Sequence, residues 1–395
     1  MNFDLLKDYI DKIVSETNTP CADIIVYKEH KEIFRYFSGY SDVENGKKIK
    51  GDELYLIYSM TKMITCVCAL QLFEKGKFLM SDPVSKYMPE FSKMRITKNT
   101  LDIEAAKNII SGNSIGEKVE NSDDGFASNP ITIKHLFTMT AGLDYDLYAD
   151  GIKKALADGK KSTREVVGAM SDTVLGFEPG TRYRYSLCHD VLGALIEIWS
   201  GEKFGDYLRK NLLEPLGMKN TFFGVPKDKE RLSKMAALYR EGPDGERKRL
   251  ELICEYNLSD EYESGGAGLV SCTEDYAVFL DALANGGMGK NEKRILSAAT
   301  VELMGTNHLD GQAAEDFDNM RNGYGYGLGV RTHINKVKSG SLSPVGEFGW
   351  DGAAGGFSMV DTKNKLSLTY FQHSRSWDLR NQTEMRNILY SSLDE

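Results

Sequence analysis

The chain has 395 residues, of which 41% are hydrophobic and 10% aromatic, and its formal net charge is −9. This length and composition support a large core in one or two closely joined domains. The charges are interspersed without a basic stripe, so we expect neither nucleic acid nor an anionic membrane as a partner. The longest apolar run, near residues 63–73, is too short to span a bilayer.

The N-terminus and the cysteines indicate a cytoplasmic protein. The first eight residues have the pattern of a charged amphipathic helix and lack the basic and apolar regions of a secretory signal. The six cysteines include no C-x-x-C pair and no disulfide-framework spacing, which favours reduced thiols. They are Cys21, Cys66, Cys68, Cys188, Cys254 and Cys272.

Helix and strand patterns alternate in the first part of the chain. Apolar residues recur with helical spacing over residues 3–14 and predict an opening helix. Two short strands are predicted over residues 22–27 and 32–37, followed by a buried helix at residues 63–73. Helices and loops then continue to about residue 230, with a long surface loop over residues 95–130. Capping boxes that begin at Ser162 and Ser271 predict two helix starts.

Strand patterns return in the last third of the chain. Residues 264–270 are strand-like, further strands are predicted over residues 326–332, 356–360 and 366–372, and residues 377–393 predict a closing helix. We therefore expect an α/β (α+β) fold in which residues 1–57 and 262–395 form one sheet domain. Residues 58–261 would form a mostly helical inserted domain, with the functional site in the cleft between the two.

The most informative motif is Ser59-Met60-Thr61-Lys62, which opens the apolar helix. A serine and a lysine three residues apart share one helix face. A serine hydroxyl becomes a good nucleophile when a nearby base takes its proton, and a buried lysine can be that base because desolvation lowers its pKa. The N-terminus of a helix also offers N–H groups to an oxyanion.

The S-x-x-K pattern alone is a weak signal, because the chain contains a second match, Ser200-Gly201-Glu202-Lys203. It follows an apolar run, and Ser200-Gly201 has the pattern of a helix C-terminus. The hydroxyl of Ser200 would lie at the negative end of a helix dipole, the wrong end for an oxyanion, so we interpret Ser200 as structural.

Several further segments follow Ser59 in a fixed order. They are S-D-P-V-S-K-Y at 81–87, I-T-I-K-H-L-F-T-M-T-A-G-L at 131–143, E-P-G-T-R-Y-R-Y-S at 178–186, G-G-A-G-L-V-S at 265–271 and G-W-D-G at 349–352. The ordered set resembles the serine β-lactamase-related superfamily, close to class C β-lactamases, and most resembles the family VIII carboxylesterases. The resemblance covers about residues 20–390. It implies a β-lactamase/transpeptidase-like fold, with an antiparallel sheet flanked by helices and an inserted mostly helical region.

By this resemblance, Ser59 is the nucleophile and Lys62 its proton acceptor. Tyr185 matches the tyrosine of the family's Y-x-N element, and its phenol could pass a proton between Ser59 and the leaving group if Lys62 lowers its pKa. The alternative for Tyr185 is a core tyrosine with a satisfied hydroxyl. The backbone N–H groups of Ser59 and Ala353 would form the oxyanion hole.

The third element of the family departs from the penicillin-recognising pattern, because the chain contains no Lys-Thr-Gly. Trp350-Asp351-Gly352 stands in its place, as Trp-x-Gly does in the family VIII-like esterases, and a strand pattern follows it. Lys338-Ser339-Gly340 is a competing match, but it lies in a polar loop with no strand after it. We therefore assign Trp350, Asp351 and Gly352 to substrate binding.

Leu187 is a second departure, since it replaces the asparagine of Y-x-N, and by its position we assign it to substrate binding as well. In β-lactam-binding relatives that asparagine and the lysine of Lys-Thr-Gly hold the substrate's amide and carboxylate. Asp351 would add a negative charge where a substrate carboxylate usually sits, which would disfavour β-lactams and favour neutral esters. The alternative is that Asp351 points away from the cleft and caps a turn.

Other patterns carry no functional interpretation. Gly112-Asn113-Ser114-Ile115-Gly116 matches a nucleophile elbow but is followed by a charged segment. The alternating glycines at 323–329 predict a twisted strand beside the cleft, and the tyrosine-rich segment 145–148 either lines a substrate entrance or packs in the core. No histidine spacing indicates a metal site, and we expect no cofactor.

The sequence therefore predicts a cytoplasmic serine hydrolase that acts through an acyl-enzyme, with small neutral carboxylic esters as the substrate class. One alternative is a β-lactamase or a D-amino-acid peptidase or transpeptidase. An alternative from another class is a catalytically idle protein that binds a peptide or a cell-wall fragment. The expected partner is a small ester or amide, and oligomeric state cannot be deduced from the sequence.

Overall fold

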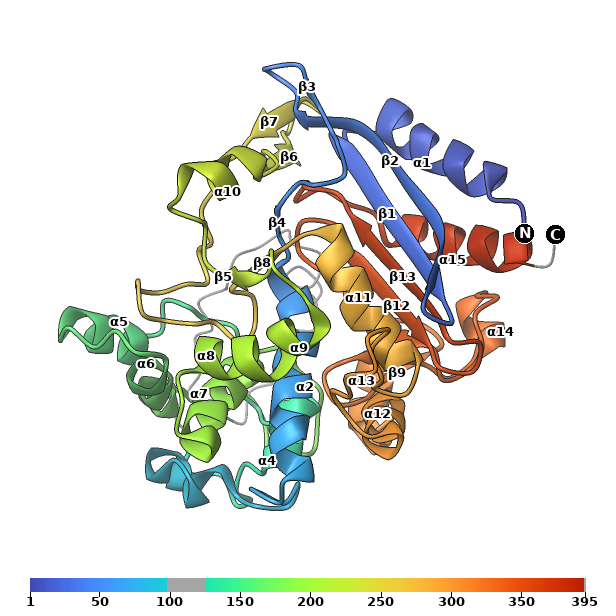
Figure 1. Cartoon of the computed structure of the whole chain (residues 1–395). Coiled ribbons are helices and arrows are strands. Elements are labelled where there is room, and N and C mark those ends of the chain that lie inside the picture. The colour runs from blue at the N-terminus through green and yellow to red at the C-terminus, as the bar shows by residue number, and fades with distance from the viewer. Residues whose placement is uncertain (98–124, 394–395) are drawn as a thin grey trace.

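Strands from both ends of the chain lie side by side in one eight-stranded sheet, as the blue and red strands in Figure 1 show. The computed structural model describes residues 1–97 and 125–393. The strand order is β3-β2-β1-β13-β12-β11-β10-β9, and each paired neighbour runs antiparallel. The strands are β1 (Cys21–Lys28), β2 (Lys31–Asp42), β3 (Lys47–Lys48), β9 (Tyr324–Tyr326), β10 (Arg331–His333), β11 (Phe348–Gly349), β12 (Phe357–Asp361) and β13 (Leu366–Phe371).

The pairing of β1 with β13 joins the two chain ends, with Asp23 opposite Phe371 and Lys28 opposite Leu366. Residues in β13 and the first six of β1 are buried, as expected for strands covered on both faces. The predicted strands over 22–27, 32–37, 356–360 and 366–372 are confirmed, as is the predicted antiparallel sheet.

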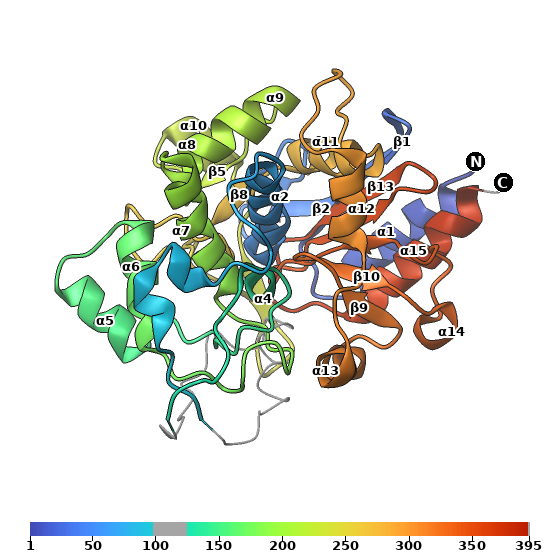
Figure 2. The ribbon, with the colours of Figure 1, turned by 90° about the horizontal axis from the view of Figure 1, so that it is seen from below.

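Helices cover both faces of the sheet. The terminal helices α1 (Asp4–Glu16) and α15 (Leu379–Leu393) pack together on the outer face, where they enclose an apolar cluster with β1, β12 and β13 (Figure 2). On the inner face α11 (Thr273–Ala284) packs against the same three strands. The shorter helices α12 (Ala298–Gly305), α13 (Gly311–Met320) and α14 (Lys336–Ser339) belong to the same end of the chain.

The predicted strand over residues 326–332 is wrong, because these residues form a hairpin between β9 and β10. The turn is closed by a hydrogen bond from Gly327 N to Val330 O at 2.7 Å, and Gly329 adopts a positive φ of 81°. A Cβ on Gly329 would lie 2.3 Å from the Cys66 sulfur. The glycine therefore lets the turn approach the buried helix that carries Lys62.

The middle of the chain is mostly helical. Its central element is α2 (Thr61–Glu74), in which twelve residues, from Thr61 to Leu72, are buried. The helix is surrounded by other elements, as its continuous apolar sequence predicts. The other α-helices here are α4 (Ile133–Phe137), α5 (Asp150–Ala157), α6 (Thr163–Ala169), α7 (Cys188–Ser200), α8 (Phe204–Leu208), α9 (Glu214–Leu216) and α10 (Lys229–Lys234).

Short strands connect the helical region to the sheet side. β4 (Tyr55–Leu56), β8 (Leu269–Ser271) and β5 (Phe222–Phe223) form a three-stranded sheet, and β6 (Tyr239–Glu241) pairs with β7 (Arg247–Arg249). The strand-like pattern at 264–270 thus ends in β8 of this small sheet. The predicted domain boundaries at 57/58 and 261/262 stay a prediction.

Two of the predicted helix ends are confirmed and one is shifted. Ser162 makes the capping box of α6 with Glu165, and α7 ends with Gly201 in the left-handed conformation. For α11 the N-cap is Cys272, whose sulfur accepts from Asp275 N, and not Ser271. The G-x-S-x-G match at 112–116 lies outside the described residues, as does most of the predicted loop at 95–130. Within the described part of the chain no helix is long and apolar enough to cross a bilayer.

The helix α1 provides a test of how the N-terminal segment stabilises the sheet. Leu6 is fully buried, whereas its neighbour Leu5 is 59% exposed. We expect Leu6→Ala to lower the free energy of unfolding by about 2–5 kcal/mol, because it leaves a cavity in the outer core. Leu5→Ala is the matched control, with an expected change within about 0.5 kcal/mol. Equal effects in urea titrations would contradict the packing of α1 on the sheet.

Candidate active site

Ser59 lies in a 3₁₀ turn (Tyr58–Met60) that leads directly into α2. The turn is held from the sheet side, because Tyr276 Oη of α11 donates to Met60 O at 2.9 Å and Ile57 N donates to Leu269 O at 3.1 Å. Tyr58 has a positive φ of 46°, a rare conformation for a residue other than glycine. These constraints fix the position of the Ser59 hydroxyl at the start of the helix.

Lys62 is fully buried, and its ammonium is held by three hydrogen bonds. Nζ lies 3.3 Å from Ser59 Oγ, 3.1 Å from Tyr145 Oη and 2.7 Å from Gly266 O. Burial lowers the pKa of Lys62 from 10.5 to about 7, although the nearby Asp190 carboxylate acts in the opposite direction. Near neutral pH a large fraction of Lys62 is therefore a neutral amine beside the Ser59 hydroxyl.

Tyr185 lies on the other side of Ser59. Its phenol accepts a hydrogen bond from Trp350 Nε1 at 3.2 Å and is hydrogen-bonded to Ser59. Burial raises the pKa of Tyr185, and the hydrogen bonds only partly oppose this effect. The expectation that Lys62 lowers this pKa is not supported, since the pKa is raised and is set by burial, Ser59, Trp350, Tyr256 and Asp351, although Lys62 Nζ lies 4.5 Å from the ring centroid. Tyr185 is a neutral phenol that can donate or relay a proton.

Tyr145 is a neighbour of Lys62 that the sequence analysis did not assign to the site. It stacks on Tyr185 with ring centroids 5.5 Å apart, and its hydroxyl contacts the Lys62 ammonium. The segment 145–148 was expected either to line a substrate entrance or to pack in the core. Tyr145 lines the pocket, whereas Tyr148 is 56% exposed and does not line it. The sequence signal for Tyr145 was its place in the tyrosine-rich segment 145–148, two residues after the segment 131–143.

A narrow pocket brings most of the predicted residues together. It is lined by Ser59, Tyr145, Tyr185, Tyr256, Arg321, Trp350, Asp351 and Ala353. Trp350 is held by Ser358, whose hydroxyl accepts from Trp350 N at 2.9 Å and donates to Trp350 O at 2.7 Å. The N–H of Ser59 lies in the first turn of a helical segment, where N–H groups lack intrahelical partners. It and Ala353 N are the candidates for the oxyanion hole.

Two predicted substrate-binding residues do not line this pocket. Leu187 is buried at the start of α7, where its N–H donates to Asp144 O at 2.9 Å. Gly352 has a role in the backbone conformation instead. Its N–H donates to Gly356 O and closes a turn, and a Cβ on it would lie 2.5 Å from Ile57 O. A side chain at position 352 would therefore push the Trp350 segment away from the turn that carries Ser59.

Asp351 faces the pocket, but its negative charge is compensated. It is hydrogen-bonded to Arg321, and its second oxygen lies 3.6 Å from Arg331 Nη1. Although burial opposes the effect, Arg321, Arg331 and Arg386 hold the pKa of Asp351 below its usual value. The expectation that Asp351 presents an uncompensated negative charge to the substrate is therefore wrong. Sequence spacing gave no sign of this pairing, because Arg321 is thirty residues away.

The two competing sequence matches lie elsewhere. Ser200 Oγ donates to Ile196 O at 2.7 Å, as a residue that ends a helix. Lys338 and Ser339 belong to α14, where Lys338 pairs with Asp318 at 2.7 Å on the surface. Neither match contributes to the pocket that contains Ser59.

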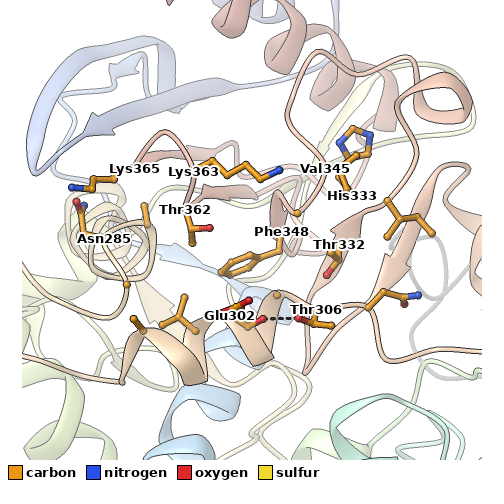
Figure 3. Close-up of a pocket in the computed structure, with 18 residues that line it drawn as sticks. Asn285, Glu302, Thr306, Thr332, His333, Val345, Phe348, Thr362, Lys363 and Lys365 are labelled. Atoms are coloured by element: carbon orange, nitrogen blue, oxygen red, sulfur yellow. Dashed lines mark hydrogen bonds between the residues drawn. The ribbon is translucent and has the colours of Figure 1, made fainter.

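A larger pocket of about 620 Å³ lies between α11, α12 and the strands β10–β13 (Figure 3). Phe348 and Thr332 line it, with Lys363 and Lys365 on the β12–β13 turn. None of the predicted site residues reaches it. Among the described residues, no group of three or more histidine, cysteine, aspartate or glutamate side chains is arranged to hold a metal ion.

Comparisons with known proteins identify the family to which the chain belongs. Residues 6–390 match the Beta-lactamase family model. Protein Rv1367c of Mycobacterium tuberculosis is 30% identical over 347 residues, which cover 85% of this chain and 81% of that protein. Esterase EstB of Burkholderia gladioli is 26% identical over 388 residues, with 91% and 87% coverage.

The solved structure of EstCE1, a hydrolase with promiscuous acyltransferase activity, superposes with a TM-score of 0.76 at 23% identity and covers 98% of this chain and 97% of that one. At that identity the superposition shows the fold alone. The family match over nearly the whole chain shows more: this protein is an enzyme that belongs to the Beta-lactamase family, as the order of its motifs indicated.

Proposed function

We propose that this protein is a carboxylesterase that hydrolyses small esters through an acyl-enzyme on Ser59. The observation that carries the proposal is the buried Lys62 amine, 3.3 Å from the Ser59 hydroxyl, with a pKa lowered to about 7. An amine that is partly neutral near physiological pH is suited to accept the serine proton.

Acylation would begin when neutral Lys62 takes the proton of Ser59 and Ser59 Oγ attacks the ester carbonyl carbon. The N–H groups of Ser59 and Ala353 would stabilise the negative charge on the carbonyl oxygen. The carbon–oxygen bond to the alcohol then breaks. The Tyr185 phenol, which is hydrogen-bonded to Ser59, would give its proton to the leaving oxygen and regain one from the Lys62 ammonium.

Deacylation would use the same groups in the reverse sense. A water molecule that takes the place of the alcohol gives a proton to the Lys62 amine and attacks the acyl carbon. The bond to Ser59 Oγ breaks, Ser59 recovers its proton, and the acid leaves. Lys62 is bound by Gly266 O and Tyr145 as well as by Ser59, so it keeps its position through both half-reactions.

Ester substrates are favoured over β-lactams by what the pocket lacks. The β-lactam-binding lysine is replaced by Trp350, whose indole binds Tyr185, and the matching asparagine is Leu187, which does not line the pocket. The similarity to esterase EstB supports the same substrate class. Small neutral esters stay the substrate class that we propose, as the sequence predicted, but the charge of Asp351 is no longer a reason to exclude anionic esters.

Acyl transfer to an alcohol is a second candidate function. An acyl-enzyme accepts either water or an alcohol, and EstCE1, which shares the fold, is described as a hydrolase with promiscuous acyltransferase activity. A product assay in the presence of added primary alcohols separates the two reactions, because transfer yields a new ester and hydrolysis yields only the acid.

The role of Ser59 can be tested with the second S-x-x-K serine as a matched control. We expect Ser59→Ala to reduce kcat/KM for p-nitrophenyl butyrate by at least about 10³-fold and to abolish labelling by a fluorophosphonate probe. Ser200→Ala should retain both. Hydrolysis that persists in Ser59→Ala would refute the mechanism, and an unlabelled wild-type protein would favour the idle binding protein. A chromogenic cephalosporin turned over as fast as the ester would favour a β-lactamase.

The role of Lys62 predicts a pH dependence. Because the neutral amine is the proton acceptor and its pKa is about 7, kcat/KM should rise with pH and reach half its maximum near pH 7. About one tenth of the maximal rate is expected at pH 6. Circular dichroism over the same range controls for unfolding. A rate that stays constant between pH 6 and 9 would contradict Lys62 as the base.

The two stacked tyrosines allow a paired test of the proton relay. Tyr185→Phe removes the phenol that contacts Ser59, and we expect a loss of about 10²–10⁴-fold in kcat. Tyr145→Phe removes one hydrogen bond to Lys62 and should cost about tenfold or less. Steady-state kinetics on one ester compare them directly. A larger loss in Tyr145→Phe would move the relay to Tyr145.

A further inference from the structure

Five charged side chains form a row that starts in the catalytic pocket, passes through Arg331 of β10 and ends on α15. Their charges alternate from plus to minus along the row: Arg321, Asp351, Arg331, Glu347 and Arg386. Arg321 binds Asp351, and Asp351 Oδ1 lies 3.6 Å from Arg331 Nη1. Arg331 Nη2 donates to Glu347 Oε1 at 3.0 Å, and Glu347 Oε2 lies 3.4 Å from Arg386 Nε.

The row is buried and carries one positive charge in excess. None of the five side chains is more than 7% exposed, and three guanidinium groups face two carboxylates. His333, beside Glu347, does not alter the balance at neutral pH, because burial lowers the pKa of its ring and keeps it neutral. Burial and the nearby Arg386 lower the pKa of Arg331 only to about 10, so it stays charged. A buried cation in excess is costly unless an anion accompanies it.

Arg321 is the end of the row that reaches the catalytic pocket. It follows α13 and lines the same pocket as Ser59 and Trp350, and its guanidinium lies 5.7 Å from the Trp350 ring centroid. Within the described part of the chain, the bond to Asp351 is the one hydrogen bond that the guanidinium makes. A guanidinium has five N–H donors, so donors are left for a ligand in the pocket.

We propose that Arg321 binds a carboxylate of the substrate, so that the preferred substrates are esters that also carry a carboxylate group. The inference rests on the proposed esterase function and specifies its substrate class. The next position in the alternating row after Arg321 is the pocket itself, where a negative charge completes the pattern. The fork of the guanidinium matches a planar carboxylate, and a single excess charge matches a monoanion. The protein as a whole has a net charge of −9, so this attraction is local.

The carboxylate could belong to the acyl chain or to the alcohol, and two pairs of esters separate these cases. Mono-4-nitrophenyl adipate and its terminal carboxamide analogue test the acyl side. 3-Carboxyphenyl acetate and 3-carbamoylphenyl acetate test the alcohol side. Within each pair only the charge changes, and rates with Ser59→Ala are subtracted as the uncatalysed background. We expect kcat/KM to be at least about tenfold higher for the anion in one of the pairs, the size of one charge-assisted hydrogen bond.

In Arg321→Met, the ratio of kcat/KM for the carboxylate ester to kcat/KM for its carboxamide analogue should fall to one or below. Arg321→Lys should retain part of the wild-type preference. Arg321→Met leaves the buried Asp351 carboxylate paired with Arg331 alone, which could prevent folding. The double variant Arg321→Met/Asp351→Asn removes both charges of the pair, and it replaces the single variant in the assay if that variant does not fold. Arg182→Met is the matched control. It removes a guanidinium that pairs with Asp316 of α13 outside the pocket, and the ratio should stay at its wild-type value.

The outcomes separate this inference from the proposed function. If wild-type enzyme hydrolyses the carboxamide esters and shows no preference for the anion in either pair, the carboxylate site is wrong and the esterase stands. A preference that survives the loss of Arg321 assigns the anion to another cation and also refutes the inference. If none of the four esters is hydrolysed faster than with Ser59→Ala, the esterase proposal itself fails.

Discussion

The burial of one amine is the constraint on which the site depends. Lys62 lies in the first turn of α2, whose residues 61–72 are all buried, and its ammonium is held by a carbonyl, a phenol and a serine hydroxyl. Desolvation brings its pKa to about 7, and only a site closed by several elements can do this. Gly266 precedes β8, Tyr145 follows α4, and Ser59 precedes α2, so the amine joins segments that are far apart in the chain.

Two electrostatic environments meet at Ser59. On the helical side, the Asp190 carboxyl, which accepts hydrogen bonds from Tyr262 and Ser264, favours the charged form of Lys62, but burial has the larger effect and lowers the lysine pKa. On the sheet side, the row from Arg321 to Arg386 places a guanidinium at the wall of the pocket. The first environment suits proton transfer, because the amine can lose its charge. The second suits binding, because an arginine keeps its charge.

The hairpin between β9 and β10 illustrates why local patterns failed near the site. Residues 323–329 alternate glycine with larger residues, and the pattern predicts one strand over 326–332. The chain instead turns at Gly327–Val330, so that Gly329 contacts Cys66 on α2. The turn is favoured by contact with a helix more than 250 residues earlier in the sequence. Arg321, just before β9, reaches the pocket from this same region, and no motif included it.

The sequence by itself determined the order of the motifs, the buried helix behind Ser59, the strands at both chain ends and the family. These features depend on spacing and apolar periodicity, which are properties of neighbouring residues. Only the tertiary structure decided that Tyr145 binds Lys62, that Leu187 lies outside the pocket, and that Asp351 is paired with Arg321 and Arg331. The reason is physical: the charge a substrate meets depends on which ionised groups folding brings within a few ångströms, and those groups are distant in sequence.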